Sequence, residues 1–248
     1  MATALVTGAS SGIGLEIARL LAKDYDLVLA ARSADKLEQL ASELGNARVV
    51  AIDLIDPDGS RKLIAEVPAV DVLINNAGFA EYGPFADANE QRLEDMIELN
   101  VTALTRLSRA YLPGMLERGS GKIMNVASTA SFQPGPLMAV YYATKAYVLS
   151  FSEALAEETR GSGVTVTALC PGPTTTNFQA TANMEKSRLV NERMLAKADD
   201  VAKYGVKAMN KGDVVAVPGL MNKVMATSIR FSPRPVVRRL VHKIQDAK

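Results

Sequence analysis

The sequence predicts one doubly wound α/β domain, in which helices cover both faces of a seven-stranded parallel sheet. Short apolar runs alternate with longer segments of helical periodicity along the chain, and a glycine-rich turn directly follows the first apolar run. This alternation is typical of βαβ units, whose strands are buried on both faces. The 248 residues are enough to bury a substantial core, and no linker rich in proline, glycine or serine divides them.

Seven short apolar runs are the predicted strands of this sheet: residues 3–6, 27–31, 49–52, 72–74, 122–126, 164–169 and 214–217. Four segments carry apolar residues at helical intervals and are predicted helices: residues 13–22, 33–44, 93–111 and 140–156. A polar stretch with weak periodicity, residues 174–200, interrupts the alternation. We expect it to be a mobile lid within a domain of residues 1–218.

The composition is that of a soluble globular protein, with 48% hydrophobic and 22% charged residues. It contains no apolar run of the roughly 18 residues that would predict a membrane-spanning helix. The first residues do not form a charged leader followed by an apolar stretch, so we predict no secretory signal and a cytoplasmic protein. The net charge of +1 gives no reason to expect a nucleic acid partner.

The charge is unevenly distributed, because residues 219–248 hold seven Lys or Arg and one acid. This basic arm carries a net charge of +6 and leaves −5 on residues 1–218. Its apolar residues recur at helical spacing, with Leu220, Val224 and Phe231 in one stripe and Pro233 near the start of a second segment. We expect the arm to cover the substrate entrance or a subunit interface. Peripheral contact with a membrane surface is the less favoured alternative.

The single cysteine, Cys170, and the single histidine, His242, exclude several kinds of site. An intramolecular disulfide needs two cysteines, and a Cys/His zinc centre needs four ligands, so no metal site is predicted. We expect Cys170 to be an inert buried thiol and His242 to be exposed. Proton chemistry must then come from Tyr, Lys, Asp, Glu or a cofactor.

The turn TGASSGIG, residues 7–14, suits a bound pyrophosphate. Its glycines, Gly8, Gly12 and Gly14, let the backbone approach phosphates closely, and the following helix presents unpaired N–H groups. The second predicted strand ends in Ala31 and Arg32, without the acid that commonly binds the ribose 2′-hydroxyl of NAD. A guanidinium at this place favours the 2′-phosphate of NADP(H).

The segment YYATK, residues 141–145, places two tyrosines one helical turn before a lysine. Side chains three or four positions apart are neighbours on a helix surface. The spacing alone therefore leaves both Tyr141 and Tyr142 open as the partner of Lys145.

Several motifs follow one another in a characteristic order: TGASSGIG at 7–14, NNAG at 75–78, Asn100, Ser128, YYATK at 141–145 and PGPTTT at 171–176. This ordered set resembles the short-chain dehydrogenase/reductase family over residues 3 to 218. The resemblance implies a single-domain Rossmann fold and an NADP(H)-dependent oxidoreductase acting on CH–OH and C=O groups. It also implies a homo-oligomer, commonly a tetramer or a dimer.

The resemblance assigns roles to individual residues. The family's Tyr-x-x-x-Lys pair falls on Tyr141 and Lys145, its serine on Ser128 and its asparagine on Asn100, which implies these four as catalytic residues. Tyr142 and Tyr147 are then expected to be packing residues. The expected cofactor-binding residues are Gly8, Ser10, Ser11, Gly12, Ile13, Gly14, Arg32, Ser33, Asp53, Leu54, Asn76, Ala77, Gly78, Tyr141, Lys145, Pro171, Gly172, Thr174 and Thr176.

The implied reaction is the reversible reduction of a ketone or aldehyde by NADPH. Tyr141 would exchange a proton with the substrate oxygen, and Lys145 together with the oxidised nicotinamide would lower the tyrosine's pKa from its ordinary value of about 10. Ser128 would hydrogen-bond the substrate oxygen, and Asn100 would hold a water in a proton relay through Lys145.

The substrate is less clearly indicated. The segment 131–141 contains Phe132, Pro134, Leu137 and Met138, which predicts an apolar wall and a fairly hydrophobic carbonyl substrate, and the expected lid adds Phe178 and Met184. A 3-oxoacyl thioester is an alternative substrate whose carrier could dock on the basic arm. An alternative of another class is a regulator that senses NADP(H) without turnover, which the complete set of four catalytic residues disfavours.

Overall fold

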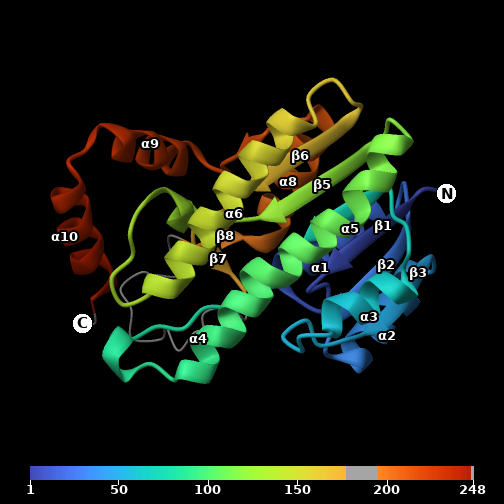
Figure 1. The fold of residues 1–248 in the computed structure, drawn as a ribbon, viewed down its shortest axis with the longest axis horizontal. Coiled ribbons are helices and arrows are strands. Elements are labelled where there is room, and N and C mark those ends of the chain that lie inside the picture. The colour runs from blue at the N-terminus through green and yellow to red at the C-terminus, as the bar shows by residue number, and fades with distance from the viewer. Residues whose placement is uncertain (177–194, 247–248) are drawn as a thin grey trace.

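The fold is a doubly wound α/β sandwich, as predicted (Figure 1). A computed structural model describes residues 1–176 and 195–246. Its seven-stranded sheet has the order β3-β2-β1-β4-β5-β6-β9, and all neighbouring strands are parallel. The strands are β1 (Thr3–Thr7), β2 (Asp26–Ala31), β3 (Ala47–Ala51), β4 (Val72–Asn75), β5 (Gly121–Val126), β6 (Val164–Leu169) and β9 (Val215–Ala216).

Successive strand residues face opposite sides of the sheet, so each face has its own core. Ala4 and Val6 pack beneath α1 (Gly12–Leu21), α2 (Ala34–Leu44) and α8 (Ala198–Lys211). Leu5 faces the other side, where α3 (Gly59–Glu66) and α5 (Leu104–Glu117) cover the sheet together with α6 (Ala139–Glu158). Both faces are therefore buried, which explains why the strands read as continuous apolar runs.

The prediction of one continuous helix over residues 93–111 is wrong. The structure has α4 (Glu90–Ile97), a π-helical turn (Glu98–Ala103) and then α5. Asn89 caps α4 by accepting a hydrogen bond from the Arg92 amide at 3.0 Å. Apolar periodicity alone could not show the inserted π turn, because the widened turn keeps the neighbouring residues helical.

The expected lid is bracketed by two very short strands. β7 (Thr174–Thr175) pairs with β8 (Ala196–Lys197) in parallel, and α8 begins at the next residue. The centre of the expected lid, residues 177–194, lies outside the described residues, and with it Phe178 and Met184. Helices α3 and α8 were not among the predicted elements.

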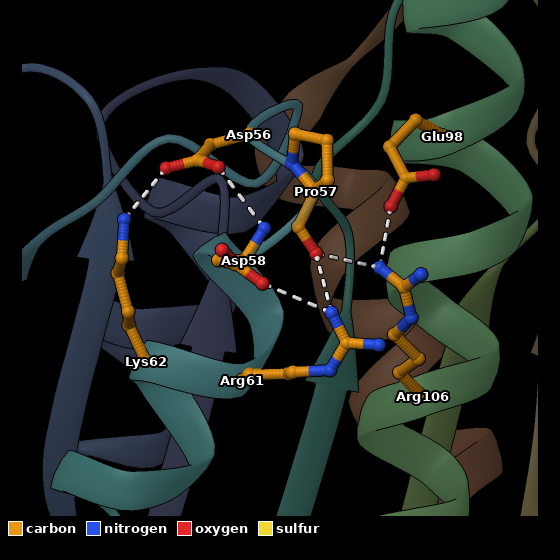
Figure 2. Close-up of polar contacts among 7 residues, drawn as sticks. All are labelled: Asp56, Pro57, Asp58, Arg61, Lys62, Glu98 and Arg106. Atoms are coloured by element: carbon orange, nitrogen blue, oxygen red, sulfur yellow. Dashed lines mark hydrogen bonds and ion pairs between the residues drawn. The ribbon is translucent and has the colours of Figure 1, made fainter.

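A network of ion pairs and hydrogen bonds fixes the turn after β3 (Figure 2). Arg106 of α5 donates to the carbonyl of Pro57 at 3.0 Å and pairs with Glu98 at 2.7 Å, while Arg61 reaches the same carbonyl at 3.4 Å. The Lys62 ammonium pairs with Asp56 at 2.8 Å. The loop that carries Asp53 and Leu54 is thereby attached to α3 and α5.

The basic arm forms α9 (Leu220–Ser228), a 3₁₀ turn (Ile229–Phe231) and α10 (Arg234–Gln245). Both helices lie beyond the end toward which β5 points (Figure 1). The predicted first stripe faces outward, since Leu220 is 78% and Phe231 85% exposed, whereas Val237 and Val241 of the second segment are buried. Among the described residues, every helix is too short or too polar to cross a membrane.

Candidate active site

The glycine turn lies where the strand order changes direction. β1 lies between β2 and β4. From β1 the strand order runs outward through β2 to β3 on one side and through β4 to β9 on the other. Ligands of open α/β sheets bind at such switch points, outside the carboxyl ends of the strands. Gly8 has a φ of +65°, and a Cβ there would lie 2.8 Å from the Asn76 amide nitrogen. Glycine is therefore required at residue 8 by both conformation and space.

Thr7 and Asn76 join the two strand ends. The Thr7 hydroxyl accepts hydrogen bonds from the Asn76 and Ala77 amides at 3.0 and 3.1 Å, and the Asn76 side chain donates to the carbonyls of Thr7 and Gly8 at 3.0 and 3.2 Å. A Cβ on Gly12 would lie 3.0 Å from Thr176. The NNAG segment and the PGPTTT segment thus support the glycine turn from two sides.

Arg32 directly follows β2 at the carboxyl edge of the sheet, as predicted. Its guanidinium lies 3.9 Å from the Asp53 carboxylate, and the two side chains are 66% and 46% exposed. Asp53 also accepts the Ile55 amide at 3.0 Å. The pair is open to solvent, so the guanidinium can turn to an incoming phosphate at little energetic cost.

Ser128, Tyr141 and Lys145 converge at the carboxyl end of β5. The Ser128 hydroxyl caps the 3₁₀ turn Thr129–Phe132 by accepting the Ala130 amide at 3.1 Å, and its side chain hydrogen-bonds the Tyr141 phenol. The Lys145 ammonium donates to the Val126 carbonyl at 2.7 Å and lies 5.9 Å from the centre of the Tyr141 ring. The Ser128 hydroxyl thus contacts the Tyr141 phenol, and the Lys145 ammonium lies near the ring of the same tyrosine.

Burial is the main cause of the pKa shifts of Tyr141 and Lys145. Tyr141 and Lys145 are 8% and 6% exposed. Burial lowers the pKa of Lys145 to about 8 and raises that of Tyr141 above its ordinary value, against an opposing contribution from the Ser128 hydrogen bond. The predicted lowering of the Tyr141 pKa included the positive nicotinamide of the oxidised cofactor and stays a prediction, while the protein groups alone raise this pKa. They keep the proton on the phenol at neutral pH.

Asn100 lies in the π turn and is 1% exposed. Its side-chain oxygen accepts the Phe79 amide at 3.1 Å, and its nitrogen donates to the Phe79 carbonyl at 3.0 Å and to the Thr144 hydroxyl at 3.1 Å. A Cβ on Gly78 would lie 2.9 Å from the Asn100 oxygen and 3.6 Å from the Lys145 nitrogen. Asn100 thus connects Phe79, the residue after the NNAG segment, to Thr144 of α6, which directly precedes Lys145.

Tyr142 is buried in a core cluster, which agrees with its expected packing role, and its phenol also has hydrogen-bond partners. Its ring packs edge-on against the Tyr141 ring, with centres 6.1 Å apart, and its phenol accepts a hydrogen bond from Gln245 in the basic arm. Gln133 hydrogen-bonds the same phenol, whose pKa burial raises to about 12. Cys170 and His242 follow the predictions, since burial raises the pKa of the Cys170 thiol to about 12 and His242 is exposed.

A cavity of about 240 Å³ lies between the loop after β4, α4 and the start of α6. Leu137 and Met138 line it, which agrees with the predicted apolar wall, while Phe132 packs in a different cluster. Leu137 has a φ of +65°, and its carbonyl accepts the Gly83 amide at 2.9 Å. A leucine in this left-handed conformation is strained, so this loop is held by its surroundings.

The other predicted cofactor residues lie at the same edge of the sheet. They are Ser10, Ser11, Ile13 and Gly14 after β1, Ser33 after β2, Leu54 after β3, and Pro171, Gly172 and Thr174 after β6. Sequence reasoning missed Tyr82, Thr144 and Gln245. No local pattern pointed to them, because each contacts a residue at least 44 positions away along the chain.

Comparison with known proteins agrees with this geometry. The short chain dehydrogenase family profile matches residues 2–187. The very-long-chain 3-oxoacyl-CoA reductase of Bos taurus is 36% identical over 180 residues, which are 68% of this chain and 58% of that relative. A solved short-chain dehydrogenase from Sphingobium yanoikuyae in complex with NADPH is 31% identical, with a TM-score of 0.85 over 100% of this chain and 98% of the other.

A bulky-bulky ketone specific alcohol dehydrogenase from Comamonas testosteroni is 29% identical, with a TM-score of 0.79 over 93% of both chains. Family profile, fold and ordered motifs agree over most of the chain. The chain therefore belongs to the short-chain dehydrogenase family of oxidoreductases.

Proposed function

We propose that this protein is an NADPH-dependent carbonyl reductase that also catalyses the reverse oxidation of an alcohol. The observation that carries the proposal is the meeting of Ser128, Tyr141 and Lys145 at the carboxyl end of β5. The glycine turn lies at the carboxyl end of β1 in the same sheet. Nicotinamide supplies a hydride to carbon, so the protein must supply a proton to oxygen.

Tyr141 is the proposed proton donor. Its surroundings keep the phenol protonated at neutral pH, which is the state that carbonyl reduction requires. Ser128 directs a hydroxyl to the same place and stabilises the negative charge that develops on the substrate oxygen. Lys145 would hold the ribose hydroxyls of the cofactor, and Asn100 would hold a water in a proton relay through Lys145.

The cofactor is proposed to be NADP(H). The tight packing of Gly8 against Asn76 leaves the backbone of the turn open to a pyrophosphate, and Arg32 provides a cation where the 2′-phosphate is expected. The relative from Sphingobium yanoikuyae was solved in complex with NADPH. The nineteen cofactor residues predicted from the sequence remain the proposed binding set.

The proposed substrate is a carbonyl compound with a hydrophobic body, because Leu137 and Met138 present apolar surface next to the start of α6. A 3-oxoacyl thioester is the second candidate. The Bos taurus relative is named for that reaction, and the basic arm carries a net charge of +6 that could attract an acidic carrier.

The test is NADPH oxidation over a panel of carbonyl compounds, followed by absorbance at 340 nm, a standard wavelength for the reduced nicotinamide. The panel pairs simple ketones such as cyclohexanone and benzophenone with acetoacetyl-CoA. Faster turnover of the ketones supports the carbonyl reductase, and faster turnover of the thioester supports the second candidate. Binding of NADPH without any turnover would instead indicate a cofactor sensor.

We also propose a cytoplasmic homo-oligomer. The one cysteine is buried and forms no disulfide, so the fold does not depend on an oxidising compartment. Assembly is supported by exposed apolar side chains on α5 and α6, where Leu116 is 41% and Tyr147 39% exposed.

A further inference from the structure

The last helix of the chain packs against the segment that carries the proposed acid. Val237 and Val241 of α10 belong to the same buried cluster as Tyr141, Met138 and Phe79. These three residues come from the segments after β4 and β5, where a substrate carbonyl must approach Ser128 and Tyr141. The inner face of α10 therefore lies beside the candidate active site rather than on a remote surface.

Gln245 fixes the end of this helix at two points. Its side-chain nitrogen donates to the phenol oxygen of Tyr142, and its backbone carbonyl accepts the Tyr82 hydroxyl at 2.7 Å. Gln245 is 0% exposed, although it is the last residue of a helix that ends near the chain terminus. Such burial is unusual for glutamine, which is mostly exposed in proteins.

Tyr142 is in turn held in place. Its ring packs on Gly135 so closely that any Cβ there would overlap it, and Gln133 hydrogen-bonds the phenol. The three residues Gln245, Tyr142 and Tyr82, named here the clasp, thus connect α10 to α6 and to the loop after β4. The clasp does not include Ser128, Tyr141 or Lys145, so opening it would change the size of the site and leave the proton-transfer groups in place.

We propose that α10 is a wall of the substrate site, held closed by the Gln245–Tyr142–Tyr82 clasp, and that the clasp determines how tightly bulky hydrophobic carbonyl compounds bind. This inference rests on the proposed carbonyl reductase. Val237 and Val241 are 7% and 5% exposed and pack against Met138 and Tyr141, so a closed α10 holds in place the apolar segment on which a large substrate would lie. A small substrate does not reach the wall, so its binding does not depend on the position of α10. Tyr142, Tyr82 and Gln245 are positioning residues in this scheme.

The test compares Tyr142→Phe, Tyr82→Phe and Gln245→Leu with the wild type, using benzophenone as the bulky ketone and cyclohexanone as the small one. Each variant deletes one clasp hydrogen bond and should raise KM for benzophenone about tenfold, the effect of losing one buried hydrogen bond. The kcat for cyclohexanone should stay within about twofold. The double variant Tyr142→Phe/Gln245→Leu should raise KM for benzophenone no more than the single variant with the larger effect. The reason is that both substitutions remove the same hydrogen bond.

The matched control is Tyr111→Phe. Tyr111 is also buried, donates to the Val67 carbonyl at 2.8 Å and has a pKa raised to about 12 by burial, but it lies under α3 on the other side of the fold. Its loss tests for general destabilisation and should leave both KM values unchanged. An equal rise of KM for both ketones in the clasp variants, or additive effects in the double variant, would overturn the proposal.

Hydrogen exchange of residues 234–246 provides a readout that does not depend on turnover. The clasp variants should exchange the α10 amides about tenfold faster than the wild type, and Tyr111→Phe should not. Unchanged exchange in all three clasp variants would show that the clasp does not hold α10. Absence of wild-type turnover with every carbonyl compound would refute the proposed function and the substrate role, while the exchange rates would still decide whether the clasp exists.

Discussion

At the residue scale, Tyr141 and Tyr142 differ in the partners of their phenol oxygens. Tyr141 meets Ser128, and Tyr142 meets Gln245 and Gln133. Because adjacent residues point about 100° apart on a helix, the two phenols cannot serve the same substrate oxygen. Tyr141→Phe should lower kcat for cyclohexanone by about a thousandfold, the range expected for loss of a general acid.

Tyr142→Phe is the comparison for this prediction, since it removes a phenol oxygen one residue away and should keep kcat for cyclohexanone within about twofold. NADPH binding, measured by fluorescence titration, should be retained in both variants. The opposite pattern, with turnover lost in Tyr142→Phe and retained in Tyr141→Phe, would reverse the assignment of the acid.

Arg32 is the proposed determinant of the preference for NADPH over NADH. A charge-assisted hydrogen bond contributes about 1.5–3 kcal/mol, so Arg32→Ser should raise the Kd of NADPH about 10- to 100-fold and leave that of NADH nearly unchanged. Arg48→Ser is a suitable control, because Arg48 is also an exposed arginine, lies in the neighbouring strand β3 and pairs with Glu66 at 3.8 Å. Equal weakening of NADPH and NADH would show that Arg32 does not contact the 2′-phosphate.

The lowered pKa of Lys145 predicts an unusual dependence of the free energy of unfolding on pH. Its pKa is about 8 in the folded protein against 10.5 for an unperturbed lysine, so between these values the unfolded state binds more protons. The free energy of unfolding should therefore rise with pH in this window, by about 2 kcal/mol between pH 8 and 9.5. Below pH 8, Lys145 is charged in the folded protein, so the full free-energy cost of burying this charge is present.

Urea denaturation of the wild type and Lys145→Met at several pH values measures this contribution. The difference between the two proteins removes the opposing titration of Tyr141, Tyr142 and Cys170, whose raised pKa values act in the other direction at higher pH. If the free energies of unfolding of the wild type and Lys145→Met differ by a constant amount from pH 7.5 to about 9.5, the Lys145 pKa is not lowered.

The residues of the proposed centre could be predicted because they follow strand ends or lie at fixed spacing within one helix. Ser128 ends β5, and Tyr141 and Lys145 are four positions apart on α6. Gln245 could not be predicted in this way, since it is 103 residues from Tyr142 and meets it only through the packing of α10. The raising of the Tyr141 pKa by burial could not be predicted either, because the sequence does not show how deeply the phenol is buried.

At the element scale, a buried chain of polar side chains crosses the sheet between α5 and α6. Asn75 donates to Ser108 at 3.1 Å and to Asn125 at 2.9 Å, and Asn125 donates to Ser152 at 2.9 Å. β4 and β5 are thus connected to both helices that flank the catalytic segment. Buried amides are costly when they lose a partner, so this chain should act as a unit.

Asn125→Ala tests the chain. Removing this central amide deprives Asn75 and Ser152 of a partner and should lower the free energy of unfolding by about 1–3 kcal/mol, measured in urea. Asn210→Ala deletes an exposed amide that accepts from Lys122 at 2.7 Å, and should cost less than about 0.5 kcal/mol. Similar costs for both variants would mean that the buried chain adds nothing beyond a surface contact.

Strands were easier to predict than helices. All seven strands were predicted within two residues of their observed ends, because burial on both faces gives a continuous apolar signal. Helix α3 was missed, since only Gly59, Ser60 and Leu63 of its eight residues are buried and its periodicity is weak. The π turn at Asn100 was missed because it depends on tertiary contacts with Phe79 and Thr144.

At the scale of the whole molecule, two of the regions that expose apolar side chains bear on assembly. The outer face of the arm holds eight large side chains exposed in the described structure: Leu220, Met221, Val224, Met225, Phe231, Val236, Leu240 and Ile244. The second region lies on α5 and α6, where Tyr147 stacks on Phe151 with ring centres 5.7 Å apart and hydrogen-bonds Thr105 at 2.9 Å. The aromatic pair is rigid, which favours it as a subunit contact.

Assembly can be assigned to one of these regions by charge substitution. The wild type should elute with a mass that is a multiple of 26.5 kDa in size-exclusion chromatography with light scattering. Tyr147→Glu places a charge on the aromatic pair and should shift the mass toward one subunit, because an unpaired charge is costly in a dry interface. Leu220→Glu places the same charge on the arm, where the side chain is 78% exposed, and should leave the mass unchanged. Dissociation by Leu220→Glu alone would instead make the arm the interface, and a wild type of 26.5 kDa would refute the proposed oligomer.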